Sequence, residues 1–254
     1  MRQAGLLVWE AHQIVRRMVA PGVATAAIDQ EVEAFFAGHK AEPLFKGYPG
    51  KKAPFPAVTC ISVNEQVVHG IPSPRELCSG DIVSVDTGCR IGGWCGDSAW
   101  TYPVGELSDS ASKLLEVGEG SLDIAFSKFG ECDKWSEVAA AISEYVHANG
   151  CSVVESLVGH GVGQQMHEPP QVPNFVNEKT LREDFQLRPG LVLAIEPMVN
   201  AGGKAVKCLH DDWTISTVDS SWSVHFEHTI ALTADGPIRL TAAPGTEADM
   251  WLGS

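Results

Sequence analysis

The chain has 254 residues, of which 44% are hydrophobic and 20% charged. This composition is typical of a folded globular protein with a sizeable core and argues against a disordered chain. The formal net charge of −14 argues against a phosphate-rich partner such as a nucleic acid, for which a basic surface is expected.

The N-terminal stretch has apolar residues on one helical face with charged residues between them, which does not fit a signal peptide. No run approaches the roughly 18 apolar residues that a membrane span needs. The seven cysteines form no C-x-x-C pair and are odd in number, which favours free thiols over a disulfide framework. We therefore expect a cytoplasmic protein without membrane contacts.

Two helical patterns open the chain. The first runs to about Val19 and ends at Pro21-Gly22, and the second begins near Thr25, which is the expected N-cap. Prolines and glycines predict a loop over residues 43–56. Residues 58–102 then have the apolar runs and turn residues of β-strands.

The same order repeats in the second half. Residues 109–128 and 131–150 predict two more helices, the second capped by Asp133 and ended by Asn149-Gly150. Strand-like segments follow at residues 152–159, 191–200, 213–219 and 223–233. Helices followed by strands, twice over and without a linker, predict an α+β protein whose two similar halves share one sheet. We expect a single domain over residues 1–254.

Two aspartates interrupt the segment DIVSVDTGCRIGGWCGDSA, which otherwise has the pattern of a buried hairpin. With residues 90–93 as the loop, Asp86 is expected directly opposite Asp97 on one face. Two carboxylates in this position destabilise a sheet unless a cation lies between them or they share a proton. For this pair taken alone, solvent-exposed acids are the simpler interpretation.

Further acids and histidines lie in apolar or glycine-rich surroundings. His160 and His167 belong to GHGVGQQMHEPP, where glycines and prolines argue against a helix. Glu196 follows a short apolar strand, and Glu227 shares one strand face with His225. Each could be an ordinary buried polar group, but Asp, Glu and His without thiolates are typical of paired divalent metals that activate water for hydrolysis.

The segments SVNEQVVHGIP, DIVSVDTGCRIGGWCGDSA, GHGVGQQMHEPPQV, IEPMVN and DDWTISTVDSSWSVHFEHTI resemble, in order along nearly the whole chain, the motifs of type I methionine aminopeptidases. The resemblance implies the pita-bread fold, in which two pseudo-symmetric α+β halves surround a curved antiparallel sheet with helices outside. It also implies a hydrolase with two divalent metal ions (Co, Mn, Fe or Zn). Such an enzyme removes the initiator methionine from nascent proteins and peptides with a small second residue, and the ribosome is a further candidate partner.

Position by position, the resemblance implies five metal ligands. Asp86 corresponds to a chelating ligand of one metal. Asp97 and Glu227 correspond to carboxylates that bridge both metals. His160 and Glu196 correspond to the remaining ligands of the other metal.

The resemblance also implies catalytic and substrate-binding residues. His69 and His167 match positions that contact the scissile peptide and stabilise the tetrahedral intermediate, and Glu196 matches the position that moves a proton to the leaving amine. The methionine pocket corresponds to Cys60, Met166 and Trp213, with Phe45, Tyr48 and Phe55 as further candidates. A thioether side chain suits such a soft, aromatic-lined pocket.

Residues 50–54 are an apparent insertion beside the pocket, and their effect on its shape is open. Two other functions also stay open. A proline-directed peptidase of the same fold is the nearest alternative, although such relatives carry an additional N-terminal domain for which a first ligand at Asp86 leaves no room. A non-catalytic module of this fold is the other, and intact ligands at all five positions argue against it.

Overall fold

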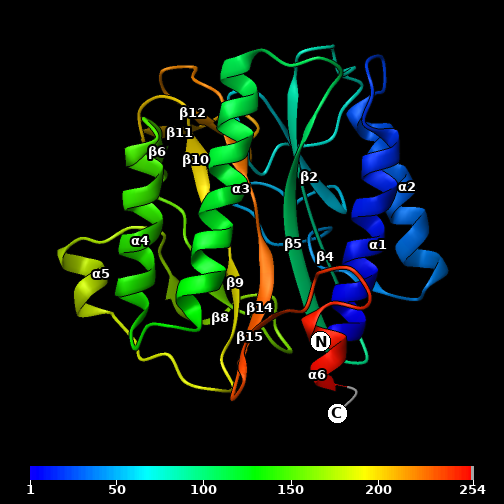
Figure 1. Cartoon of the computed structure of the whole chain (residues 1–254). Coiled ribbons are helices and arrows are strands. Elements are labelled where there is room, and N and C mark those ends of the chain that lie inside the picture. The colour runs from blue at the N-terminus through cyan, green and yellow to red at the C-terminus, as the bar shows by residue number, and fades with distance from the viewer. Residues whose placement is uncertain (253–254) are drawn as a thin grey trace.

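Two pairs of helices cover one side of the molecule, and the strands lie between and behind them (Figure 1). The computed structural model describes residues 1–252, so the last two residues of the predicted domain lie outside the described part. The helices are α1 (Arg2–Met18), α2 (Thr25–Gly38), α3 (Asp109–Phe129), α4 (Trp135–Ala148), α5 (Glu178–Arg182) and α6 (Glu247–Leu252). The two predicted helix pairs are confirmed as α1 with α2 and α3 with α4.

The caps predicted for two of these helices are wrong. Thr25 is the first residue of α2 and not its N-cap, and its hydroxyl donates to the Ser73 carbonyl at 3.0 Å. Helix α4 follows Lys134. The Glu137 carboxylate accepts hydrogen bonds from the backbone N–H groups of Asp133 and Lys134, at 3.0 and 3.1 Å. An acid inside the first turn therefore caps α4 in place of the predicted Asp133.

Within the described residues, the strands form four antiparallel sheets. The first contains β1 (Glu42–Pro43), β2 (Thr59–Val63), β4 (Ile82–Ile91) and β5 (Trp94–Pro103). The second contains β6 (Ser152–Val153), β10 (Met198–Asn200) and β13 (Ser223–His225). The third contains β3 (Gln66–Val68), β11 (Val206–Cys208) and β12 (Ile215–Thr217). The fourth contains β7 (Gly159–Gly161), β8 (Glu168–Val172), β9 (Val192–Ile195), β14 (His228–Thr233) and β15 (Gly236–Arg239).

The hairpin of β4 and β5 turns at Gly92-Gly93, whose φ angles are 59° and 83°. This two-residue turn with positive φ matches the twist of the flanking strands. It places Asp97 opposite Gly88, and Asp86 opposite Ala99. The predicted register, with Asp86 directly opposite Asp97, is therefore wrong by two residues. Because the shift is even, both aspartates stay on the same face as diagonal neighbours.

The two halves meet where β5 runs beside the chain that leads into β14. Side-chain hydroxyls make this contact: Ser98 donates to the Glu227 carbonyl at 2.6 Å, and Thr101 donates to the His225 carbonyl at 2.9 Å. Each half has its own apolar core under its helix pair, and Trp100 of β5 packs against both cores. The junction of the halves therefore combines side-chain hydrogen bonds with apolar packing.

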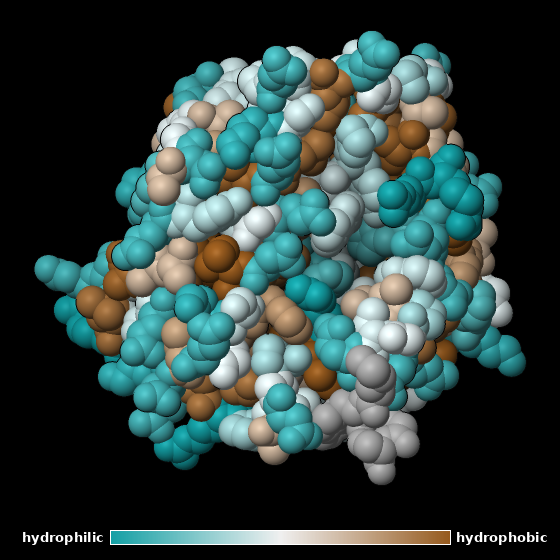
Figure 2. Space-filling model, in the orientation of Figure 1, coloured by the Kyte–Doolittle hydropathy of each residue, from teal (hydrophilic) through white to brown (hydrophobic). Residues whose placement is uncertain are grey.

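The outer face is mainly hydrophilic over the helices, with scattered apolar residues (Figure 2). None of the helices among residues 1–252 combines the length and the hydropathy that crossing a membrane requires. All seven cysteines are free thiols. Cys60, Cys89 and Cys95 are buried, whereas Cys78 and Cys208 are exposed.

Candidate active site

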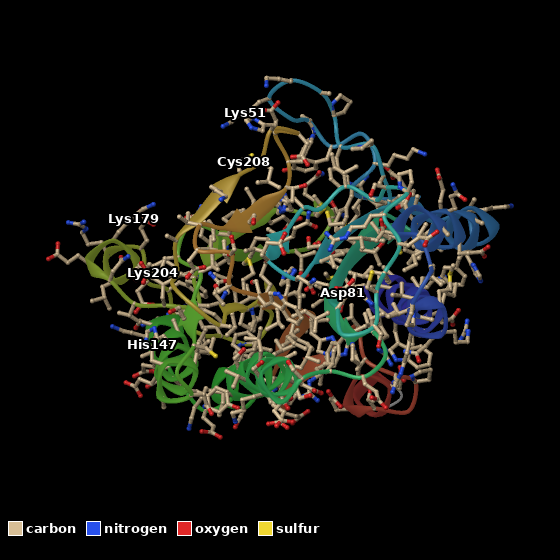
Figure 3. All side chains as sticks on the ribbon, turned by 90° about the horizontal axis from the view of Figure 1, so that it is seen from above. Lys51, Asp81, His147, Lys179, Lys204 and Cys208 are labelled. Carbon is tan, nitrogen blue, oxygen red and sulfur yellow. The ribbon has the colours of Figure 1, made fainter. Side chains whose placement is uncertain are left out.

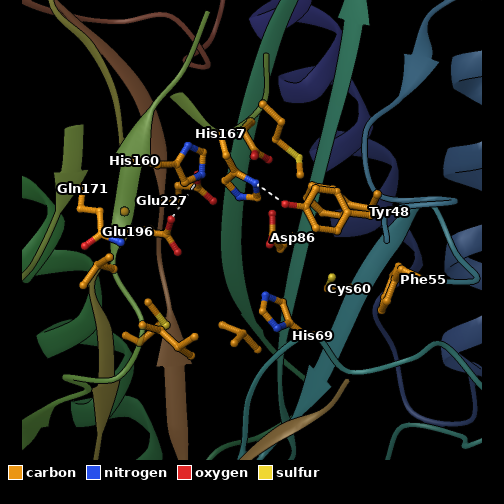
Figure 4. A pocket seen from close by; sticks show the side chains of 18 of the residues that line it. Tyr48, Phe55, Cys60, His69, Asp86, His160, His167, Gln171, Glu196 and Glu227 are labelled. Carbon is orange, nitrogen blue, oxygen red and sulfur yellow. Dashed lines mark hydrogen bonds and ion pairs between the residues drawn. The ribbon is translucent and has the colours of Figure 1, made fainter. Parts of the chain in front are cut away.

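A cavity of about 610 Å³ opens where the strands of the two halves meet (Figure 4). The first half contributes Asp86 from β4 and Asp97 from β5. The second contributes His160 from β7, Glu196 after β9 and Glu227 before β14. The cavity is also lined by the other predicted site residues, Cys60, His69, Met166, His167 and Trp213. The fold therefore gathers all of the predicted site residues around one space.

Among residues 1–252, the ion pairs of the cavity acids involve histidines and no lysine or arginine. Asp97 and Glu227 are 4% and 2% exposed. Among the described residues, no hydrogen-bond partner faces Asp86 Oδ1, Asp97 Oδ1 or Glu227 Oε1. Burial, with repulsion from the neighbouring acids, raises the pKa of Asp86 and of Glu227 well above the usual range. Burial also raises the pKa of Asp97 and of Glu196 to about 7. The cluster needs added positive charge in order to ionise fully.

His160 adds a nitrogen whose protonation is fixed by its surroundings. Its Nδ1 lies 2.9 Å from the Gly161 carbonyl oxygen, which can only accept, so Nδ1 carries the proton and Nε2 has a free lone pair. That Nε2 lies 3.6 Å from Glu196 Oε1, and burial lowers the pKa of His160. Asp97, His160 and Glu227 each offer one ligand atom, and these three atoms lie within 4.8 Å of one another. Carboxylate oxygens and an imidazole lone pair in this arrangement fit a divalent metal ion, whose charge would favour the ionised form of the acids.

Two more histidines face the cavity. His69 follows β3 and has a φ of 59°, in the left-handed region that non-glycine residues rarely adopt. Burial lowers the pKa of His69 to about 4, and desolvation also lowers the pKa of His167. Both rings are therefore neutral near pH 7 and each has one N–H to donate. The rings of His160 and His167 lie 4.2 Å apart in a T-shaped arrangement.

The other end of the cavity is apolar. Phe45, Phe55, Cys60 and Met166 are buried in one cluster, and Trp213 packs against it. The rings of Phe55 and Trp213 are 5.1 Å apart and nearly perpendicular. Aromatic rings and sulfur atoms around a space of this kind suit an unbranched apolar side chain.

Residues 50–54, the segment expected to be an insertion, lie at the outer edge of the molecule, where Figure 3 labels Lys51. Lys52 forms a 2.6 Å ion pair with Asp212, the chain neighbour of Trp213. This ion pair therefore connects the loop of residues 50–54 to the loop that carries Trp213.

Sequence reasoning missed His225 as part of the site. This histidine is 2% exposed, and its Nε2 lies 3.5 Å from Glu196 Oε2. Its place on the strand face of Glu227 was a signal, but nothing in the sequence pairs it with Glu196. Tyr48, predicted as a pocket candidate, also has an unexpected partner, because its hydroxyl lies 2.9 Å from Nδ1 of His167.

Buried carboxylates and imidazole beside a substrate-sized cavity are the donor set of metal-dependent hydrolases. The sequence model of metallopeptidase family M24 matches residues 1–234, and the chain belongs to this family. Methionine aminopeptidase 1 of Bacillus subtilis is 48% identical over 236 residues, covering 93% of this chain and 92% of that relative. Methionine aminopeptidase of Clostridium perfringens is 43% identical over 241 residues, covering 95% and 94%.

Solved structures agree on the fold. The crystal structure of methionine aminopeptidase from Thermotoga maritima superposes with a TM-score of 0.90 at 39% identity, covering 96% of this chain and 95% of that one. Prolidase from Pyrococcus furiosus has a TM-score of 0.71 at 19% identity and shares the fold alone. This chain covers 62% of that prolidase. The predicted α+β pita-bread fold is confirmed.

Proposed function

We propose that the chain is a methionine aminopeptidase that uses two divalent metal ions to remove N-terminal methionine from nascent proteins and peptides with a small second residue. The main support for the proposal is that one cavity contains both a cluster of acidic side chains and an apolar pocket lined by aromatic and sulfur-containing side chains. The relatives named above support the choice of methionine over proline-directed substrates, since the prolidase likeness extends to the fold only.

The unpartnered acids and the lone pair of His160 are the proposed ligands. Asp86 and Asp97 would hold one ion, His160 and Glu196 the other, and Asp97 with Glu227 would bridge the two. Divalent ions bound there supply Lewis acidity, which polarises a carbonyl and lowers the pKa of a water molecule. The donor set accepts Co, Mn, Fe or Zn, and it spans both halves. This supports a single catalytic domain over residues 1–254, because neither half contains the full set.

Side chains of the protein bind the substrate, donate hydrogen bonds to the scissile peptide and transfer the proton. The apolar pocket binds the methionine side chain and so places the first peptide bond beside the acids. His69 and His167 donate N–H groups to the scissile peptide, where negative charge develops on the carbonyl oxygen. Glu196 accepts a proton from the attacking water and passes it to the leaving amine. A substrate of this kind places the enzyme in the cytoplasm, with the ribosome as a candidate partner.

Substrate choice tests the proposal. Purified protein with added Mn is given Met-Ala-Ser and Ala-Pro-Ser in one reaction, and the products are separated by chromatography. We expect free methionine and intact Ala-Pro-Ser. Cleavage of Ala-Pro-Ser alone would favour the proline-directed alternative, and cleavage of neither would favour a non-catalytic module.

A further inference from the structure

Neighbouring histidines of the cavity have different partners at Nδ1. His160 donates from Nδ1 to the Gly161 carbonyl, as described above. Nδ1 of His167 instead lies 2.9 Å from the hydroxyl of Tyr48, and Figure 4 shows this contact beside the acids. A carbonyl forces one direction on its hydrogen bond, whereas a hydroxyl can donate or accept.

The chemistry of the two groups gives this bond its direction. A phenol hydroxyl is a good donor but a weak acceptor, and the unprotonated nitrogen of a neutral imidazole is a good acceptor. An imidazole with the ordinary histidine pKa of about 6.5 is mostly neutral at about pH 7.5 and above, so it has one N–H and one lone pair. The hydroxyl of Tyr48 therefore donates to Nδ1, and the single proton of His167 lies on Nε2.

Tyr48 is itself held in place by the loop around it. Its N–H donates to the Phe45 carbonyl and its carbonyl accepts from the Phe55 N–H, both at 2.9 Å. The Gly47 N–H donates to the Phe55 carbonyl at 2.8 Å and closes the base of the loop. The ring of Tyr48 meets that of His167 edge-on, with centroids 5.4 Å apart. These backbone hydrogen bonds fix the main chain of Tyr48 in a position from which its hydroxyl reaches Nδ1 of His167.

We propose that Tyr48 is a positioning residue, which holds His167 in the Nε2–H tautomer so that it can donate into the cavity. The two neighbouring histidines thus have opposite tautomers for opposite tasks. His160 presents a lone pair to a metal, and His167 presents a proton to the peptide carbonyl oxygen. The catalytic part of this inference rests on the proposed function, whereas the tautomer does not.

The tautomer can be measured without turnover. Ring nitrogen-15 NMR of zinc-loaded protein reports which nitrogen carries the proton, and a His167→Gln spectrum assigns the signals. We expect one Nε2–H form in the parent protein and a mixture of both tautomers in Tyr48→Phe, which keeps the ring and loses the hydroxyl. Tyr145→Phe, on α4, is the matched control and should resemble the parent. An Nδ1–H form in the parent, or an unchanged tautomer in Tyr48→Phe, would overturn the inference.

Kinetics on Met-Ala-Ser tests the consequence. Tyr48→Phe should lower kcat about 10- to 100-fold, by analogy with the loss of activity when the hydrogen-bond partner of a metal-ligating histidine is removed. KM should stay within about twofold of the parent value, because the hydroxyl orients a hydrogen bond that stabilises the transition state more than the bound substrate. In a His167→Ala background, Tyr48→Phe should cause no further loss, and additive losses would overturn the inference. If the NMR spectra show the expected tautomers but the protein releases no methionine, the proposed function is contradicted. The hydrogen bond from Tyr48 to His167 is still supported by that result.

Discussion

Thr229 holds both backbone polar groups of Asp97. Its hydroxyl accepts a hydrogen bond from the Asp97 N–H at 3.0 Å and donates one to the Asp97 carbonyl at 2.8 Å. Both residues are buried, and they come from opposite halves of the chain. The position of one proposed bridging ligand therefore depends on a strand more than a hundred residues away.

Thr229→Val should weaken both the fold and metal binding. Valine has a similar shape but leaves two buried backbone groups without partners, which costs on the order of 2 kcal/mol of unfolding free energy. Urea denaturation measures this loss, and calorimetric titration with Mn measures the affinity. Thr233→Val is the matched control, since the Thr233 hydroxyl also bonds two backbone groups but near the far end of β14. Unchanged Mn affinity in Thr229→Val would contradict the role given to this contact.

Replacement of His160 and replacement of His167 should have different effects on metal content and on activity. His167→Ala should lose about 10²- to 10³-fold in kcat, as expected for a donor to a developing oxyanion, with normal metal content. His160→Ala should lose metal, because it removes the lone pair that faces Glu196. Elemental analysis beside steady-state kinetics makes the comparison. Metal loss in His167→Ala with normal metal in His160→Ala would show that the roles are reversed.

Gly50→Ala should raise KM for methionine peptides. A Cβ at residue 50 would collide with the Ala53 carbonyl and with the ring of Trp213. Displacement of this ring from Phe55 opens the wall of the apolar pocket, and we expect a roughly tenfold higher KM, equivalent to about 1.4 kcal/mol of binding. Gly38→Ala, which places a Cβ in open space, is the control. An unchanged KM would mean that the inserted loop does not shape the pocket.

Acid should destabilise the protein through His12. Burial lowers the pKa of His12 to about 4, and both ring nitrogens have partners, the Tyr102 hydroxyl at 2.8 Å and the Ser98 carbonyl at 3.0 Å. The unfolded chain has a His pKa of about 6.5, so it binds more protons than the folded chain between these values. The contribution is complete above the unfolded pKa and is lost as the pH falls towards about 4, on the order of 3 kcal/mol in total.

Urea denaturation of chelator-treated protein at about pH 7.5 and about pH 5 checks this expectation. His12→Gln should be less stable than the parent at the higher pH but lose less stability on acidification. An equal loss in the variant and the parent would show that His12 does not contribute to the acid sensitivity.

Local sequence patterns were sufficient to predict the four long helices α1 to α4, but not the short helices α5 and α6. The spacing of Ile28, Val32 and Phe36 indicates one apolar face of α2, and all three side chains are fully buried. The register of strands β4 and β5 could not be predicted in the same way, because it depends on the length of the turn between them. The pair Gly92-Gly93 accepts positive φ and allows a two-residue turn, whereas a four-residue loop over residues 90–93 was expected.

The contacts across the cavity could not be predicted from the sequence. His225 meets Glu196 because two strands of the second half pair in one particular register, with Met198 opposite His225. Tyr48 meets His167 across 119 residues of chain, between two loops without periodic pattern. The resemblance to type I methionine aminopeptidases named the candidate side chains, but the second partners of these side chains depend on the tertiary fold.

The most direct test is the release of free methionine from Met-Ala-Ser by protein stripped of metal with a chelator and then reloaded. Metal content is measured in the same samples, and Asp97→Asn is the control that removes a proposed bridging ligand. We predict no release by the stripped protein, recovery on addition of Mn, Fe or Co, and no recovery in Asp97→Asn. Full release by the chelated, metal-free protein would contradict the account.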